Sequence, residues 1–340
     1  MRIRYQDIEA LPLLLFTRRL QFILRKARIV SRTLKPNHWS NCRMKLEGKD
    51  IRLSGRLIRI ASLDGDKYEF PDDPEVMLSQ LRTCGTRIDL FTFLQRIPET
   101  VPKYSYPMEW DNLAVLPVST FEHWWNKQIR SYPRNRARQA EKKGVVLREI
   151  EWSDALLQGI CEIYNETPIR QGRRFPHYGM TIDRARAYAG TFPDRSIFIG
   201  AFLGAKIIGF AKLVTDATRT HACLVHILST VAHKDKAPTN ALIAQAVRSC
   251  CDRGISYLVY EHFAYGKKQG DSLSHFKEVN GFIRMDLPRY YVPLTALGRT
   301  ALKFGLHHRL LFYIPESLAS GLRDLRKRWY SQRFQSMVES

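Results

Sequence analysis

The amino-acid sequence predicts an α/β protein in which strands and amphipathic helices alternate along most of the chain. Two apolar runs joined by Gly204-Ala205 have the pattern of adjacent strands, and a third strand-like run follows at 220–230. Residues 255–282 then place a buried strand, a polar loop, a short helix and a new apolar segment in succession. This order favours a central sheet flanked by helices.

The segment 255–282 gives the most specific local signal. Ile255, Tyr257 and Val259 indicate a buried strand, and Asp271 or Ser272 can cap the helix that follows. Polar side chains crowd the exit of the strand, where ligands gather in open α/β sheets. These side chains are Glu261, His262, Tyr265, Lys267 and Lys268.

The helix and its end resemble a known signature. The matching residues are Leu273, Phe276, Lys277, Asn280, Gly281 and Phe282. They are similar to the "LxxFKxxNGF" ending of Gcn5-related N-acetyltransferase (GNAT) domains, in the branch with the FemABX-type peptidoglycan aminoacyltransferases and the CelD-like acyltransferases. Taken alone, they also fit a helix C-cap among ordinary core residues.

The resemblance covers roughly residues 130–295 and implies a GNAT-like acyltransferase domain over 131–297. In that fold four strands are neighbours in a mixed sheet, and the last two splay apart at their C-terminal ends. The strands expected here lie near 197–202, 206–215, 221–229 and 255–260.

The region 46–130 is predicted to be a reduced, GNAT-like N-terminal half, because FemABX-like proteins carry two such halves and this region is too short for a full copy. Its expected elements are a strand over 51–60, a helix over 71–84, a strand over 87–97 and a helix over 119–129.

Both ends of the chain are basic. Residues 1–45 are expected to form an amphipathic segment whose longest apolar run, Leu11–Phe16, is too short to span a bilayer. Residues 298–340 are expected to form basic helices. Each segment could lie on an anionic membrane surface or pack against the body with its charges solvated, and the C-terminal one would also suit nucleic acid.

Composition points to an anionic partner. The chain has 340 residues, with 54 Lys and Arg against 33 Asp and Glu, a formal net charge of +21. Nucleic acid, a phosphorylated ligand and a membrane surface all fit such a charge. Six cysteines without a CxxC pair favour free thiols in a reducing cytoplasm and no metal site.

Two basic stretches are candidate ligand surfaces. The helix within 132–146 resembles the "RRNIRKAEKxGV" signature of the same branch, and its cations could face an anion or simply be solvated. A Gly- and Pro-rich loop at 167–179 corresponds to the segment that covers the acceptor in GNAT proteins. Its substrate-binding candidates are Arg170, Arg173, Arg174, His177 and Tyr178.

The helix after the strand at 220–230 departs from the usual GNAT pattern. Ordinary members cradle the pyrophosphate of coenzyme A with a glycine-rich loop, whereas residues 231–246 contain no glycine. The residues that could contact the donor here are His226, Lys234, Lys236, Thr239, Asn240, Lys267, Lys268 and Ser272. Phe276 also stands where ordinary members have a tyrosine that protonates the leaving thiolate.

The resemblance implies transfer of an acyl group, from acyl-CoA, to an amine or hydroxyl of a cell-envelope or small-molecule acceptor, without metal. Glu261 is the expected base, Tyr265 the expected acid, and Lys277 a group for the oxyanion or donor phosphates. One alternative is a FemX-type aminoacyltransferase that uses aminoacyl-tRNA. The other is a non-catalytic basic binding module. We expect a cytoplasmic protein, with peripheral contact at the inner membrane face as an option, and no DNA partner.

Overall fold

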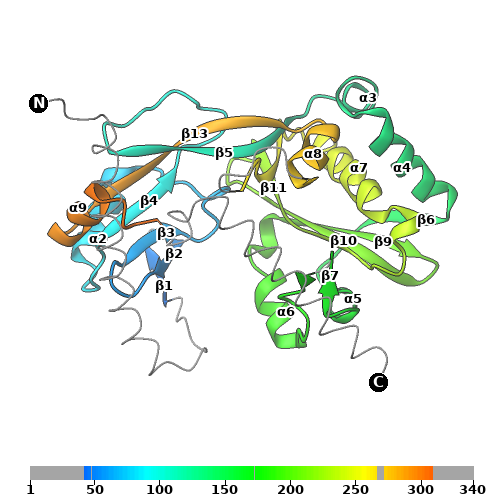
Figure 1. Cartoon of the computed structure of the whole chain (residues 1–340), viewed down its shortest axis with the longest axis horizontal. Coiled ribbons are helices and arrows are strands. Elements are labelled where there is room, and N and C mark those ends of the chain that lie inside the picture. Colours follow the sequence, from blue (N-terminus) through cyan, green and yellow to red (C-terminus); the bar gives the residue numbers. More distant parts are fainter. Residues whose placement is uncertain (1–41, 47, 172, 266–271, 309–340) are drawn as a thin grey trace, which may run out of the picture. The chain divides into compact units, whose positions relative to one another are not determined.

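The computed structural model describes residues 42–46, 48–171, 173–265 and 272–308 (Figure 1). Within these ranges the chain forms an eleven-stranded mixed sheet, helices that pack on it, and a separate two-stranded ribbon. The predicted α/β class with a mixed central sheet is confirmed. Residues 1–41 and 309–340, which hold most of the two predicted basic end segments, lie outside the described part of the chain.

The first part of the sheet packs on one helix. That helix, α2 (Pro74–Thr83), begins where the Asp73 side chain accepts a hydrogen bond from the Glu75 amide, with Pro74 in the first helical position. Its apolar side is buried against the neighbouring strands. These are β1 (Cys42–Leu46), β2 (Lys49–Ser54), β3 (Ile60–Leu63) and β4 (Leu90–Leu94).

The alternation over 51–60 predicts one strand, and this is wrong. The chain turns at Gly55, whose φ is +84°, and returns as β3 antiparallel to β2. A Cβ at Gly55 would lie 2.0 Å from the Ile58 carbonyl oxygen, so the turn requires glycine.

The helix predicted over 119–129 is also not regular. One α-helical turn, α3 (Phe121–His123), is followed by a π-helical turn, η1 (Trp124–Gln128). The wider turn accompanies the burial of Trp124, whose Nε1 donates a hydrogen bond to the Asn280 carbonyl at 3.0 Å.

The second part of the sheet carries helices on both faces (Figure 1). α4 and α7 share one apolar core with the sheet, and α5 and α6 share another. Among the described residues no helix is long and apolar enough to cross a membrane. The elements are β5 (Met108–Pro117), α4 (Ser131–Lys142), β6 (Val145–Ile150), α5 (Asp154–Asn165), β7 (Ile169–Arg170), β8 (Arg173–Arg174), α6 (Ile182–Ala189), η2 (Pro193–Arg195), β9 (Ser196–Leu203), β10 (Lys206–Thr215), β11 (His221–Ser229), η3 (Lys234–Lys236), α7 (Pro238–Cys251), β12 (Tyr257–His262), α8 (Ser272–Val279), β13 (Ile283–Pro293) and α9 (Ala296–Lys303).

The strand order is β1-β2-β3-β4-β13-β5-β12-β11-β10-β9-β6. The four strands predicted to be neighbours are β9 to β12, and they are adjacent in the sheet. β13 pairs with both β4 and β5, so it joins the first part of the chain to the second in one sheet. β5 in turn lies between β13 and β12.

β11 and β12 separate as predicted. They run parallel and pair only between residues 221–223 and 257–259. Past these positions β11 continues to pair with β10, while β12 shifts its register against β5. The C-terminal halves of the two strands therefore do not hydrogen-bond to each other.

Candidate active site

The predicted base, Glu261, lies where β12 leaves β11. Its backbone φ is +52°, in the left-handed region, and the register of β12 against β5 shifts between Val259 and His262. A bulge of this kind re-aims a side chain at the end of a strand. The left-handed conformation costs roughly 1–3 kcal/mol for a residue with a Cβ, so the surroundings must hold it.

A lysine from the first part of the chain contacts this carboxylate. The Lys67 ammonium group forms an ion pair with Glu261, whose side chain is 36% exposed. The Lys67 carbonyl also lies 2.9 Å from the His221 ring nitrogen Nε2, which ties the lysine's loop to β11. The sequence prediction did not include Lys67, because no local pattern connects residues 194 positions apart.

A partly buried ion-pair network fixes the same loop from the other side. The Arg289 guanidinium lies 2.9 Å from the Asp66 carboxylate and 2.8 Å from Asp111, and the His262 ring lies 2.9 Å from Asp111. Burial opposes ionisation of Asp111, but the hydrogen bond from His262 and the charge of Arg289 hold the pKa of that carboxyl well below its usual range. The network therefore positions the residues on both sides of the Lys67–Glu261 pair.

A neutral histidine, His226, lies in the part of β11 that no longer pairs with β12. His226 stands opposite Lys212 across β10 and β11, and its ring lies 4.6 Å from that of Tyr188. Burial, together with the nearby Lys212 charge, lowers the pKa of His226 to about 4. Its Nε2 atom has no hydrogen-bond partner among the described residues. Burial and the Glu261 carboxylate raise the pKa of Tyr188.

Lys212 holds Tyr188 in place by binding the end of α6 and the residues just after it. Its fully buried amine donates hydrogen bonds to the Ala189 carbonyl at 2.8 Å and to the Thr191 hydroxyl at 3.0 Å. Burial lowers the pKa of this amine to about 8. A buried amine with its donors satisfied is a structural anchor. The sequence signal for it is one lysine inside an otherwise apolar strand, and the sequence prediction did not include it.

Tyr265 and Lys277 are brought together at the same strand end. The fully buried Lys277 amine donates a hydrogen bond to the His262 carbonyl and lies 4.9 Å from the centre of the Tyr265 ring. Tyr265 is 41% exposed, and its ring lies 5.6 Å from that of His262. Lys267 and Lys268 lie outside the described residues, and Ser272 is exposed at the start of α8.

The substrate-binding candidates in the loop 167–179 do not all lie together. Arg170 turns inward and donates to the carbonyls of Ser229 at 2.6 Å and Ile163 at 2.7 Å. His177 stacks near Tyr188, with ring centres 5.0 Å apart, so it lies on the side of the sheet that holds His226. Arg173, Arg174 and Tyr178 are exposed.

The residues around the start of α7 that were predicted to contact the acyl donor lie near two backbone amides that already donate hydrogen bonds to a carboxylate. The Glu166 carboxylate accepts hydrogen bonds from the amides of Val231 at 2.6 Å and Ala232 at 2.8 Å. Lys234 and Lys236 follow in η3, and Asn240 lies in the first turn of α7. The Thr239 hydroxyl lies 2.9 Å from that of Ser229, at the end of β11.

The structure also has a surface pocket of about 400 Å³. It is lined by Pro117, Lys127, Gln128, Arg130, Glu278, Gly281, Phe282 and Ile283. None of the predicted site residues lines it. We therefore place the candidate site at Glu261, where strained backbone, charge and opened strands coincide.

No family model matches the sequence, and no curated protein sequence matches it. Solved structures do resemble the fold. The C-terminal domain (DUF2156) of a protein designated lysylphosphatidylglycerol synthetase, from Agrobacterium fabrum, gives a TM-score of 0.50 at 17% identity, over 77% of this chain and 86% of that one. L-PGS from Bacillus licheniformis gives 0.51 at 12% identity, over 75% and 84%. FemX gives 0.49 at 10% identity, over 72% and 86%. The two structures with TM-scores of 0.50 and 0.51 show that this chain shares their fold.

Proposed function

We propose that this chain is a transferase that moves an acyl or aminoacyl group from an activated donor to an amine or a hydroxyl. The observation that carries the proposal is Glu261, a carboxylate held in a left-handed backbone conformation at the separated ends of β11 and β12. Strain of this kind persists where surrounding structure enforces it, and such sites are often functional. The fold adds support, since structures that share it include a protein named as a synthetase of lysylphosphatidylglycerol.

In the proposed reaction Glu261 removes a proton from the acceptor, directly or through one water, as the acceptor nitrogen or oxygen attacks the donor carbonyl carbon. The bond from that carbon to the leaving oxygen or sulfur then breaks. The leaving group takes up a proton, for which the Tyr265 phenol is the candidate. Tyr265 is suited by position, because its ring contacts His262, the residue after Glu261.

Two donors fit this chemistry, an acyl-CoA and an aminoacyl-tRNA. Lys234 and Lys236, close to the start of α7, would suit the phosphates of coenzyme A. The position of Glu166 instead supports aminoacyl-tRNA as the donor. Its carboxylate already accepts hydrogen bonds from the Val231 and Ala232 amides that a pyrophosphate would use. A pyrophosphate there would have to displace a negative charge. We therefore favour aminoacyl-tRNA and keep acyl-CoA as the second candidate.

The basic helix α4 offers a surface for tRNA. Arg134 donates to the Trp125 carbonyl at 2.9 Å, and Arg136 donates to the Lys234 carbonyl at 3.1 Å. Arg138 and Lys142 are exposed, so these two are the cations on which a test should act.

Filter retention of aminoacyl-tRNA and calorimetry with acetyl-CoA distinguish the donors. Reversal of Arg138 and Lys142 to Glu should weaken tRNA binding and lower the salt slope by about 0.7–0.9 for each phosphate that the variant no longer neutralises. Reversal of the exposed Lys206 and Arg299 is the matched control. Acyl-CoA would be the donor if the chain binds acetyl-CoA and shows no salt-dependent tRNA binding. In that case Lys234→Ala and Lys236→Ala should abolish the acetyl-CoA binding.

A further inference from the structure

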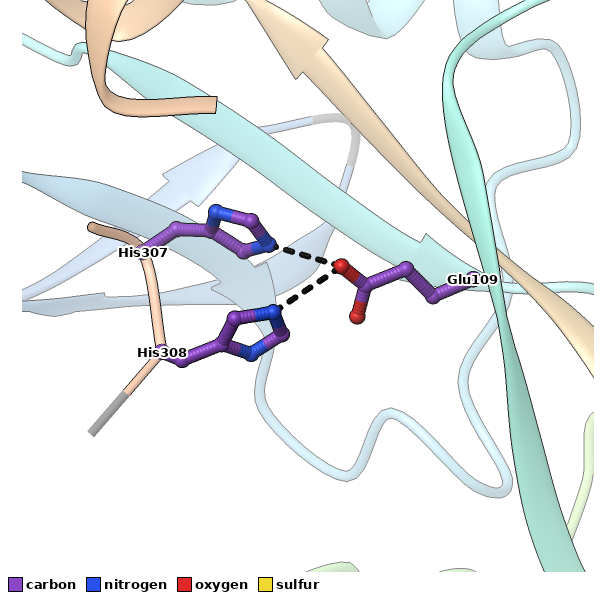
Figure 2. A group of neighbouring side chains, drawn as sticks. All are labelled: Glu109, His307 and His308. Atoms are coloured by element: carbon purple, nitrogen blue, oxygen red, sulfur yellow. Dashed lines mark hydrogen bonds and ion pairs between the residues drawn. The ribbon is translucent and has the colours of Figure 1, made fainter. Parts of the chain in front are cut away.

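A cluster of metal-ligating side chains lies outside the site described above (Figure 2). Glu109 stands near the start of β5, and His307 and His308 follow α9. The Nε2 atoms of His307 and His308 each lie 3.0 Å from the Glu109 atom Oε1. All three ligand atoms lie within 4.8 Å of one another.

The local backbone explains why two consecutive histidines point the same way. Gly305 has a φ of +68°, and the Leu306 amide donates to the Ala301 carbonyl at 2.8 Å. This is the hydrogen-bond pattern of a Schellman helix end, which reverses the chain sharply after α9. The two imidazole rings then lie side by side, with centres 4.0 Å apart, and face Glu109 (Figure 2).

The cluster is held by its surroundings. The His307 side chain is only 2% exposed, and its ring packs 4.7 Å from that of Tyr291 in β13. Glu109 is 41% exposed, which leaves the cluster open to solvent on one side.

We propose that Glu109, His307 and His308 bind a divalent transition-metal ion, with zinc as the best match. Zinc bonds to nitrogen and oxygen of about 2.0–2.2 Å in a tetrahedron place ligand atoms about 3.3–3.5 Å apart. The two nitrogen–oxygen separations of 3.0 Å therefore need to open by only a few tenths of an ångström. Two imidazoles and one carboxylate select zinc and its transition-metal neighbours over calcium and magnesium, which prefer oxygen ligands.

The bound ion fastens the turn after α9 to β5. Three protein ligands leave a fourth position for water. β5 continues to Asp111, whose carboxylate contacts both Arg289 and His262, so the ion anchors the strand that carries this network. This anchoring role does not depend on the proposed transfer reaction.

The test uses the full chain without an affinity tag, stripped of metal with a chelator. Zn²⁺ titration by calorimetry should show a site that Glu109→Gln removes. Gln can still accept hydrogen bonds from the histidines but ligates zinc poorly, so this variant separates ligation from hydrogen bonding. We expect its affinity to fall by more than the roughly 10–100-fold that loss of an outer-shell partner costs a metal site.

Two further measurements keep the test decisive. Co²⁺ bound to the native protein should give the visible absorption of a four- or five-coordinate site, and His308→Ala should abolish it. The matched control is Glu122→Gln with His123→Ala, two exposed residues that should leave binding unchanged. The melting temperature should rise with Zn²⁺ in the native chain only. Equal Zn²⁺ binding by the native chain and Glu109→Gln, or no binding by either, would show that the cluster is held by hydrogen bonds alone.

Discussion

At Glu261 the backbone conformation and the side-chain charge can be tested separately. The φ of +52° is a left-handed backbone conformation that residues with a Cβ avoid. The carboxylate, in turn, pairs with Lys67. Alanine and glycine at this position both remove the ion pair and differ only in the Cβ. Stability differences between the two variants therefore report on the backbone alone.

We predict that Glu261→Gly is more stable than Glu261→Ala by about 1 kcal/mol, because glycine adopts the left-handed conformation without strain. Urea unfolding of the two variants measures the difference. An alanine variant as stable as the glycine variant would mean that residue 261 is not left-handed in solution.

The lowered pKa of His226 leads to a prediction about the pH dependence of stability. Its pKa of about 4 in the folded chain lies below the ordinary value of 6.5. Between these values the unfolded chain binds a proton that the folded chain does not, so stability is lost as pH falls through this window. His226→Phe keeps the ring contact with Tyr188 and should reduce the loss between pH 7.5 and 5.0 by up to about 2 kcal/mol.

Denaturant unfolding of both proteins at the two pH values checks this. His177 and His221, whose pKa values burial also lowers, are present in both and cancel in the comparison. An identical loss of stability in the native chain and the variant would contradict a buried, neutral His226.

At the scale of elements, local chemistry predicted most boundaries. Asp73-Pro74 starts α2 as expected, and Gly144, with a φ of +76°, follows the end of α4. The two failures had different causes. The turn at Gly55 interrupts an alternating pattern that continues on both sides of it, and the π-turn of η1 depends on Trp124 reaching the Asn280 carbonyl, which no neighbouring residue signals.

The network that joins β5, β12 and β13 can be tested against an exposed pair. Asp111→Asn removes one partner of the partly buried Arg289, which keeps Asp66. We expect a loss of about 2–3 kcal/mol, somewhat less than the breaking of an isolated buried pair. Asp286→Asn breaks the half-exposed pair with Arg284 and should cost less than about 0.5 kcal/mol.

Thermal or urea unfolding of Asp111→Asn and Asp286→Asn gives the comparison directly. Equal and small effects would show that the Asp111 network contributes no more than a surface pair, and that it does not position Glu261.

At the scale of the whole molecule, the resemblance of the sequence to the GNAT fold predicted that β9 to β12 are neighbours, and they are. It could not predict that β5 lies between β13 and β12, since that pairing joins residues far apart in sequence. Glu261 could be predicted from its place at the exit of a strand. Its partner Lys67 could not, because the two residues are far apart in sequence. The Glu109 and histidine cluster was missed likewise, because its ligands are 198 residues apart.

The proposed function places group transfer at Glu261. The most direct measurement is the rate of transfer of a labelled aminoacyl group from aminoacyl-tRNA to a mixture of membrane lipids and cell-wall precursors, by the native chain and by Glu261→Gln. Glutamine keeps the size of the side chain and removes the base. We predict that the variant binds tRNA as tightly as the native chain but transfers roughly 10²–10⁴-fold more slowly, while the exposed control Glu122→Gln keeps the native rate. Equal transfer rates for Glu261→Gln and the native chain would show that Glu261 is not the base.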